Sequence, residues 1–365
     1  MAGVYVSYPF CGQKCTYCNF ASGVQPRKLE LAYEEALVRE ISAHAWQWRP
    51  ETVYLGGGTP SRMTADSLAA ILRAVPGAPW TEATMEASPG DVTADRARMW
   101  RDVGITRVSL GVQSFVDLEL RQTGRKHTAE TVAEEVERLR SAGIEAINID
   151  LIAGLPHQTL DSWRESLAWI RRLAPPHVSV YLLEVDEDSR LGLEILGQGS
   201  RYGAAAVPGE SEMADLYELA VEELAFLGIE RYEISNFARV GSESRHNLKY
   251  WQLEPYAGFG ADAHGFDGHE RVQNAESATE YVERMRARGS AVVERIGAEL
   301  EQEKFFVGLR LMRGVQPTAG EWTRWHEPIE RFIGAGLLER AGGALRLTRR
   351  GVLLSNEVFQ EFVSS

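Results

Sequence analysis

The three cysteines of the chain lie close together, at Cys11, Cys15 and Cys18, and no other cysteine occurs among its 365 residues. An odd number of cysteines in one short window of a long chain does not form a disulfide framework, whereas grouped thiolates bind metal. A structural zinc site needs four closed ligands, and neither a fourth cysteine nor a nearby histidine accompanies these three. The spacing C-x3-C-x2-C therefore favours a [4Fe–4S] cluster in which one iron has no protein ligand.

The elements that must position these cysteines alternate between strands and helices. Short β-rich runs are expected at 4–6, 52–55, 84–87, 107–112, 146–152 and 177–184. The first helix is expected where apolar and aromatic residues recur at helical spacing, namely Leu29, Tyr33, Leu37, Ile41, His44 and Trp48. Six strand–helix steps need crossover connections, and these imply a parallel sheet. We expect an α/β fold built as a partial or complete β/α barrel, with a doubly wound open sheet as the alternative.

Alternation along the strands predicts a polar interior. In the run 147–151 the odd positions are aliphatic and are expected to face the outer helices, which leaves Asn148 and Asp150 facing inward. The same phase points further residues inward: Tyr5, Ser7, Glu86, Ser88, Ser109, Gly111 and Gln113. Burying such groups costs free energy unless each has a partner. The interior is therefore predicted to be wet and to hold a ligand.

The regular alternation of strands and helices ends after residue 185. Residues 186–209 are expected to be irregular, and an amphipathic helix is expected from about Met213 to Leu227. We divide the chain into a barrel core at 1–235, a loop-rich elaboration at 236–297, and a smaller α+β module at 298–365. The module is expected to contain two helices and a hairpin, like a winged helix. It has no basic stripe, which favours packing or partner docking over DNA binding.

Composition sets the class of protein. Hydrophobic residues make up 44% and charged residues 25%, which are values typical of a globular protein. The net charge of −13 argues against nucleic acid as a partner. No apolar run reaches the ~18 residues of a transmembrane segment. The first ten residues contain no Lys or Arg and resemble no secretory signal, so we expect a cytoplasmic protein.

Several stretches together resemble one family. They lie at 8–20, 56–61, 111–115, 148–152, 154–156, 246–251 and 345–356. They resemble the radical S-adenosylmethionine family, in the branch that holds oxygen-independent coproporphyrinogen III oxidase and related haem chaperones. The resemblance implies that the open iron chelates the amino and carboxylate groups of S-adenosylmethionine. Electron transfer into the sulfonium then yields a 5′-deoxyadenosyl radical, and the protein orients this chemistry.

The resemblance also implies which residues contact the cofactors. Tyr5 matches a tyrosine at the methionyl part of the cofactor, and Tyr17 matches an aromatic residue beside the adenine. Gly57, Gly58 and Thr59 match backbone that approaches the amino group; considered alone, such a glycine run indicates a tight turn. Four further residues match cofactor contacts: Glu86, Gln113, Arg125 and Asp150. For Arg125, which alternation does not place inside, a solvated surface position is the alternative.

Two departures favour a haem chaperone over an oxidase. The oxidase motif continues to a fourth cysteine, where this chain has Phe20. The oxidase also carries a segment before its first strand, which we expect to be missing here because Cys11 lies near the start. The resemblance then implies haem or porphyrin as cargo, with acceptor haemoproteins and an electron donor as partners. A radical protein acting on another small substrate remains a third interpretation.

A haem ligand is expected in the stretch His246-Asn-Leu-Lys-Tyr-Trp251. Neutral imidazole is a common axial ligand of haem, and aromatic faces suit a porphyrin. His246 is therefore the first candidate and His264 the second. The alternative is a structural histidine whose ring is hydrogen-bonded within the fold, because lone histidines seldom bind metal.

Overall fold

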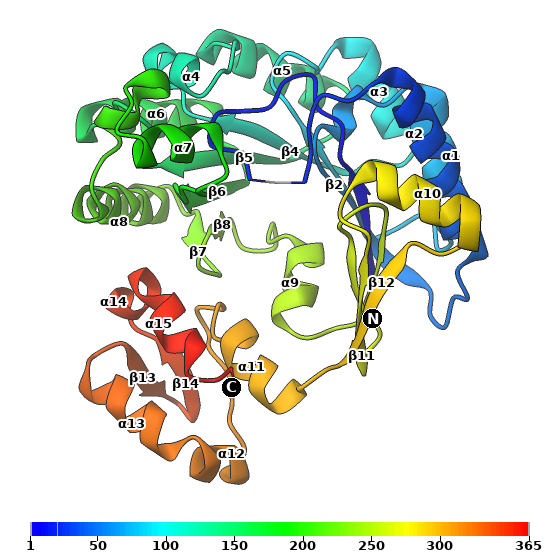
Figure 1. Cartoon of the computed structure of the whole chain (residues 1–365). Coiled ribbons are helices and arrows are strands. Elements are labelled where there is room, and N and C mark those ends of the chain that lie inside the picture. The colour runs from blue at the N-terminus through cyan, green and yellow to red at the C-terminus, as the bar shows by residue number, and fades with distance from the viewer. Residues whose placement is uncertain (1, 20, 364–365) are drawn as a thin grey trace.

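The computed structural model describes residues 2–19 and 21–363 and has the predicted α/β fold. Its centre is a set of six parallel strands that follow each other in chain order (Figure 1). They are β1 (Ala2–Tyr8), β2 (Pro50–Gly57), β3 (Glu82–Ala87), β4 (Arg107–Gln113), β5 (Ala146–Ala153) and β6 (His177–Leu182). The helices between them are α1 (Arg27–Ala43), α2 (Ala65–Ala74), α3 (Ala94–Asp102), α4 (Asp117–Gln122), α5 (Ala129–Ser141) and α6 (Leu160–Leu173).

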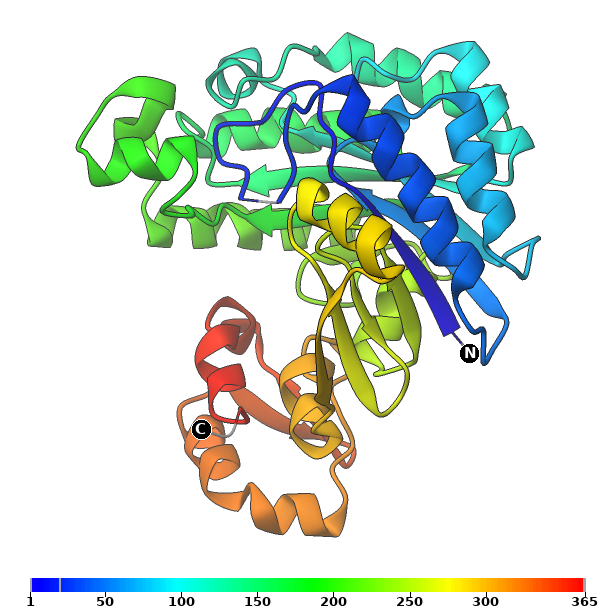
Figure 2. The same ribbon diagram turned by 45° about the vertical axis from the view of Figure 1, so that its right-hand side comes forward.

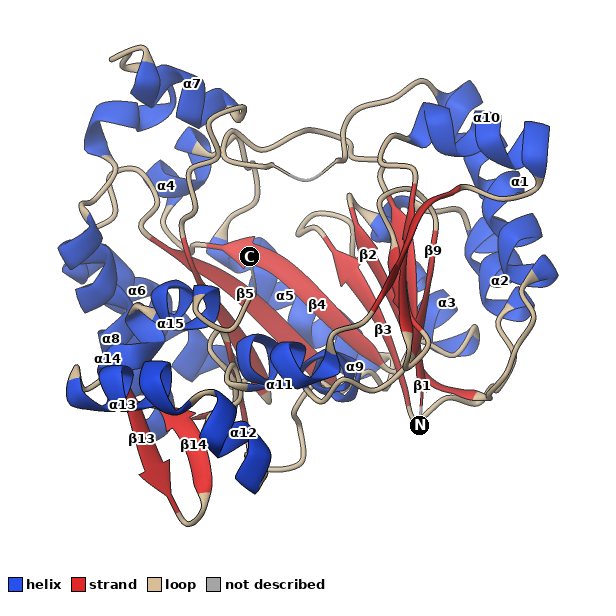
Figure 3. Ribbon diagram, turned by 60° about the horizontal axis from the view of Figure 1, so that its bottom comes forward, coloured by secondary structure: helices blue, strands red, loops and turns tan. Residues whose placement is uncertain are grey.

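Consecutive strand order identifies this sheet as a partial barrel. A doubly wound sheet would reverse its strand order at a switch point, and β1 to β6 do not. The full sheet has twelve strands and runs β12-β11-β10-β9-β1-β2-β3-β4-β5-β6-β8-β7, so its two ends are not paired with each other. Figure 3 shows the strands fanned out with helices around their outer side. The inner side of the fan is left open toward the rest of the chain.

Aliphatic residues hold the outer face of the strands against the helices. Val4, Val6, Ile147 and Ile149 are completely buried, as the alternation predicts. Threonine begins four of the surrounding helices, because its hydroxyl accepts a hydrogen bond from the backbone N–H three residues later. These N-caps are Thr64, Thr93, Thr128 and Thr159. Each such cap stabilises its helix by about 1 kcal/mol.

Two sequence-based expectations about helices are wrong. Helix α1 ends at Ala43, so His44 and Trp48 lie beyond it. His44 has extended backbone, and its ring packs against Trp46 and Phe259, so tertiary packing ends the helix although the apolar spacing continues. The stretch at 186–209, expected to be irregular, contains helix α7 (Arg190–Leu196) and a 3-10 turn at Arg201–Ala206. The long helix that follows, α8, spans Glu210–Phe226.

The stretch at 236–297 is largely regular and not rich in loops, which corrects the expectation. Its strand β9 pairs in parallel with β1, from Gly3 opposite Tyr256 to Val6 opposite Phe259. Its strands are short, so alternation is hard to recognise in the sequence. Together with the preceding β7 (Glu230–Arg231), the elements are β8 (Asn236–Ala238), α9 (Arg245–Trp251), β9 (Tyr256–Phe259), β10 (His264–Phe266), β11 (Glu270–Asn274), α10 (Ala278–Arg288) and β12 (Val292–Gly297).

The C-terminal module lies below the sheet, and β12 leads into it (Figure 2). It contains the expected hairpin, but three helices precede the hairpin where two were expected, and two short helices follow it. Its elements are α11 (Leu300–Gly308), α12 (Ala319–Arg324), α13 (His326–Gly334), β13 (Leu338–Ala341), β14 (Ala344–Leu347), α14 (Arg349–Leu353) and α15 (Ser355–Gln360). Backbone pairing between Glu233 and Leu311 joins the module to the barrel. None of the helices in the described part of the chain combines the length and apolarity that a membrane span requires.

Candidate functional site

A cavity of about 800 Å³ lies at the carboxyl ends of the parallel strands, where barrels carry their sites. The loop after β1 lines one part of it, and residues of the C-terminal module line another. The structure brings nearly all the predicted cofactor residues to this cavity. They are Cys11, Cys15, Tyr17, Cys18, Gly57, Gly58, Thr59, Glu86, Gln113, Arg125 and Asp150.

The cysteine loop is held by backbone hydrogen bonds. The N–H of Cys11 donates to the carbonyl of Gly23 (2.9 Å), and the N–H of Thr16 donates to that of Thr123 (3.2 Å). The three cysteines are half-buried, and none of them is in a disulfide. Phe20, which stands where the oxidase motif has its fourth cysteine, lies outside the described residues.

The donor set fits an iron–sulfur cluster better than a single metal ion. Across residues 2–19 and 21–363, no group of three or more His, Cys, Asp or Glu side chains is arranged to hold one ion. Thiolates of a cluster bind different iron atoms, so they need not converge on one point. Three cysteines on the wall of one cavity, none of them in a disulfide, meet this requirement.

The glycine run after β2 packs against the start of the cysteine loop. Gly57 has a φ of 107°, which favours glycine, and its N–H donates to Glu86 Oε2 (3.0 Å). The N–H of Gly58 donates to the Tyr8 carbonyl (2.8 Å), and a Cβ on Gly58 would lie 2.7 Å from the carbonyl oxygen of Phe10. Glycine at position 58 is therefore required by the close approach of two backbone segments.

Two half-buried carboxylates face the cavity. Glu86 accepts a hydrogen bond from the Tyr54 hydroxyl (3.0 Å), and Asp150 accepts one from the Ser109 hydroxyl (2.9 Å). Burial, with a further contribution from the charge of Asp150, raises the pKa of Glu86 to about 7. Burial also raises the pKa of Asp150, although hydrogen bonds to its charged form oppose this. A cationic ligand would relieve the unfavourable burial of both charges.

Arg125 lies inside the cavity, and the alternative of a solvated surface arginine does not hold. Its guanidinium donates to the carbonyl of Gly111 (2.6 Å) and to the Tyr17 hydroxyl (3.5 Å). Four buried polar atoms among the cavity-lining residues have no hydrogen-bond partner within the described chain: Gln113 Oε1, Arg125 Nε, His127 Nε2 and Arg310 Nε. Unpaired buried polar groups are costly, so these atoms indicate a polar ligand.

His127 is a cavity residue that the sequence reasoning missed. Burial and the adjacent charge of Arg125 lower its pKa to about 4, so the ring is neutral at pH 7. It lies two residues after Arg125, beyond the end of β4 and outside any strand, so alternation gave no signal for it.

Tyr5 and the two haem candidates, His246 and His264, are predicted residues that do not line the cavity. Tyr5 packs its ring against Tyr54, which does line the cavity, with 6.1 Å between ring centroids. His246 is fully buried, with Nδ1 2.8 Å from Thr52 Oγ1 and Nε2 2.7 Å from the Tyr250 hydroxyl. Both ring nitrogens are occupied, and burial lowers the pKa of His246 to about 3. This geometry is that of the structural histidine considered as the alternative.

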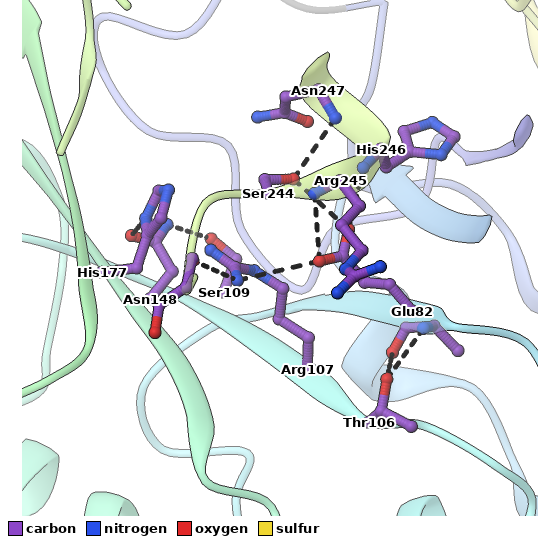
Figure 4. A network of polar contacts seen from close by, with 12 residues as sticks. Glu82, Thr106, Arg107, Ser109, Asn148, His177, Ser244, Arg245, His246 and Asn247 are labelled. Atoms are coloured by element: carbon purple, nitrogen blue, oxygen red, sulfur yellow. Dashed lines mark hydrogen bonds and ion pairs between the residues drawn. The ribbon is translucent and has the colours of Figure 1, made fainter. Parts of the chain in front are cut away.

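A buried polar network holds helix α9, which carries His246, against the amino ends of the strands (Figure 4). The N–H of His246 donates to Glu82 Oε1 (2.9 Å), and Arg107 Nη1 lies 3.8 Å from Glu82 Oε2. Nearby, His177 Nδ1 lies 2.6 Å from Asn148 Oδ1. The network fixes the position of α9 relative to the barrel. His264, the second haem candidate, is exposed on β10.

The fold and the site together define a radical S-adenosylmethionine protein, and residues 5–170 match the Radical SAM superfamily. Coproporphyrinogen III oxidase (HemN) from Escherichia coli has the same fold: the TM-score is 0.84 at 21% identity, over 99% of this chain and 89% of that one. The heme chaperone HemW of Bacillus subtilis is 33% identical, over 100% of this chain and 99% of the relative. HemW of Lactococcus lactis is also 33% identical, over 98% and 96%. The chain belongs to the HemW family.

Proposed function

We propose that this protein is a haem chaperone that binds haem and passes it to acceptor haemoproteins. The observation that carries the proposal is the match to relatives named heme chaperone HemW along essentially the whole chain. The absence of a fourth cysteine supports a chaperone over an oxidase, since Cys11, Cys15 and Cys18 are the only cysteines. The likeness to HemN concerns the fold, and it does not favour oxidase activity here.

The chaperone would carry a [4Fe–4S] cluster and S-adenosylmethionine as cofactors. We assign the cluster to the three cysteines, and S-adenosylmethionine to the adjoining residues Tyr17, Gly57, Gly58, Thr59, Glu86, Gln113, Arg125 and Asp150. Tyr5 would act through Tyr54, against which its ring packs. When bound on the cluster, S-adenosylmethionine supplies one-electron chemistry.

The residues of the chain have separable roles in this site. Glu86 and Asp150 would attract the cationic groups of the cofactor, because each is a half-buried carboxylate without a cationic hydrogen-bond partner among the described residues. Arg125 would hold Tyr17 in place through its hydrogen bond to the hydroxyl. The buried Gln113 Oε1 would accept a hydrogen bond from the ligand.

The setting and the partners belong to the same proposal. We place the protein in the cytoplasm, where haem would be delivered to acceptor haemoproteins and an electron donor would reduce the cluster. The division at 1–235, 236–297 and 298–365 is kept as a proposal for domain organisation. The C-terminal module would then act as the wall that closes the cofactor cavity from below.

One anaerobic experiment separates the two functions. The cluster is reconstituted, and the same preparation is tested for haem binding, for haem transfer to an apo-haemoprotein and for turnover of coproporphyrinogen III. The proposal expects haem binding and transfer without decarboxylation. Decarboxylation of coproporphyrinogen III at a steady rate, without transfer of haem, would assign the protein to the oxidases.

A further inference from the structure

Arg310 is fixed in place where the C-terminal module meets the barrel. It follows helix α11 and lines the cavity. The N–H of Ile234 donates to the Arg310 carbonyl (3.1 Å), and the N–H of Met312 donates to the Tyr232 carbonyl (3.0 Å). These bonds extend the backbone pairing of Glu233 with Leu311. The side chain therefore projects from a backbone that is tied to the barrel on both sides.

The guanidinium of Arg310 is held by stacking and by charge. Its Cζ lies 4.5 Å from the ring centroid of Trp251, and Nη2 lies 3.7 Å from Glu233 Oε2. The carboxylate of Glu233 is fully buried, whereas the Arg310 side chain is 27% exposed. Arg310 Nε is buried without a hydrogen-bond partner in the described part of the chain. A guanidinium has five N–H donors, so Arg310 retains donors for a ligand.

Several apolar side chains line the cavity near this end of the molecule, beside polar residues such as Ser235, Ser355 and Asn356. Tyr181 and Leu182, at the end of β6, are 41% and 38% exposed, although both are large side chains. Val352 and Leu353 of helix α14 line the same cavity. Apolar side chains with one well-placed cation are suited to a flat apolar molecule that carries a carboxylate. A tetrapyrrole with propionate groups has this chemistry.

We propose that Arg310 binds a propionate carboxylate of the tetrapyrrole cargo, with the ring lying between the end of β6 and helix α14. The assignment rests on the proposed function, because it names the place of the haem that the chaperone carries. It gives the aromatic stretch at 246–251 a different role from that of an iron ligand. His246 holds helix α9 in place through its hydrogen bonds, and Trp251 stacks on Arg310, which binds the tetrapyrrole.

The test uses the full-length, cluster-loaded protein and three probes: haemin, haemin dimethyl ester and metal-free protoporphyrin IX. Affinities are measured by Soret absorbance and tryptophan quenching for the wild type and for Arg310→Gln. We expect Arg310→Gln to weaken the binding of haemin and of protoporphyrin IX about tenfold or more, because one charge-assisted hydrogen bond is lost. The affinity for the dimethyl ester, which has no free carboxylate, should change less than about twofold on the same reasoning.

Arg324→Gln is the matched control. Arg324 also stacks on a tryptophan, with Cζ 5.0 Å from the Trp325 ring, and it pairs with Glu301, but it lies outside the cavity. Its substitution should leave all three affinities unchanged. If Arg310→Gln weakens the binding of haemin and of the dimethyl ester equally, or weakens neither, the assignment of Arg310 is overturned. The proposed function still stands in that case, provided that the wild type binds haemin. A wild type that binds no haemin overturns both.

Discussion

Replacing Glu86 with glutamine tests whether a half-buried carboxylate holds the cationic cofactor. Glu86 lines the cavity, and its oxygens accept hydrogen bonds from the Tyr54 hydroxyl and the Gly57 N–H, each at 3.0 Å. Burial and the charge of Asp150 raise its pKa to about 7. Glutamine keeps the shape and removes the charge. We therefore expect Glu86→Gln to retain the cluster and to bind S-adenosylmethionine more weakly.

The pKa of about 7 makes the expected loss depend on pH. The carboxylate is roughly 10% ionised at pH 6 and about 90% ionised at pH 8, so the charged fraction that attracts a cation grows about ninefold over this range. At pH 8 one charge-assisted interaction is worth about 1.5–3 kcal/mol, which is on the order of tenfold to a hundredfold in affinity. The ratio of wild-type to variant affinity should therefore rise about five- to ninefold from pH 6 to pH 8.

Anaerobic calorimetry of S-adenosylmethionine binding at pH 6, 7 and 8 measures this ratio. Using the ratio cancels the titration of the cofactor's own amino group, which is common to both proteins. Glu135→Gln is the control, because burial also raises the pKa of Glu135 to about 7 and yet this residue lies off the cavity wall. A ratio that stays constant with pH, or a Glu135→Gln variant that behaves like Glu86→Gln, refutes the reasoning.

Three further outcomes are expected. Cys15→Ala should lose the cluster, measured as iron and sulfide content, and intact content would contradict the cluster assignment. Gly58→Ala should be destabilised in urea unfolding, because the added Cβ would meet backbone atoms at 2.7–2.8 Å, whereas Gly23→Ala, with open space around it, should not be. His246→Gln should lower the free energy of unfolding at pH 7 by about 1–3 kcal/mol, since it unpairs buried partners. The pKa of His246 is lowered to about 3, so the free energy of unfolding of the wild type should fall by about 1.6 kcal/mol more than that of this variant as the pH falls from 6.5 to 5; equal losses would contradict a buried neutral ring.

Much of the cofactor site can be predicted because a strand alternates its side chains with a period of two. Glu86, Gln113 and Asp150 interrupt aliphatic runs at inward positions, and the structure brings all three to one cavity. Arg125 and Tyr17 lie in loops, where no periodicity applies. Their place could be expected only from the family resemblance.

The parts that sequence reasoning missed depend on contacts between distant segments. Trp251 and Arg310 are far apart in the chain, and only the fold places the guanidinium over the indole ring. The role of His246 was also undecided, because an imidazole in an aromatic stretch has the same pattern whether it binds iron or Thr52. Strand β9 is four residues long, which is too short for alternation to reveal its place beside β1.

The pairing of β9 with β1 has a consequence for how the chain is made. Strand β1 leaves the ribosome before the other described strands, and one of its edges pairs with β2 soon afterwards. The other edge pairs with residues 256–259, which are synthesised about 250 residues later. At roughly 5–20 residues per second, this interval lasts on the order of 10–50 seconds. During that time the strand that leads into the cysteine loop presents unpaired backbone groups, so the nascent chain depends on protection from aggregation until two thirds of it has emerged.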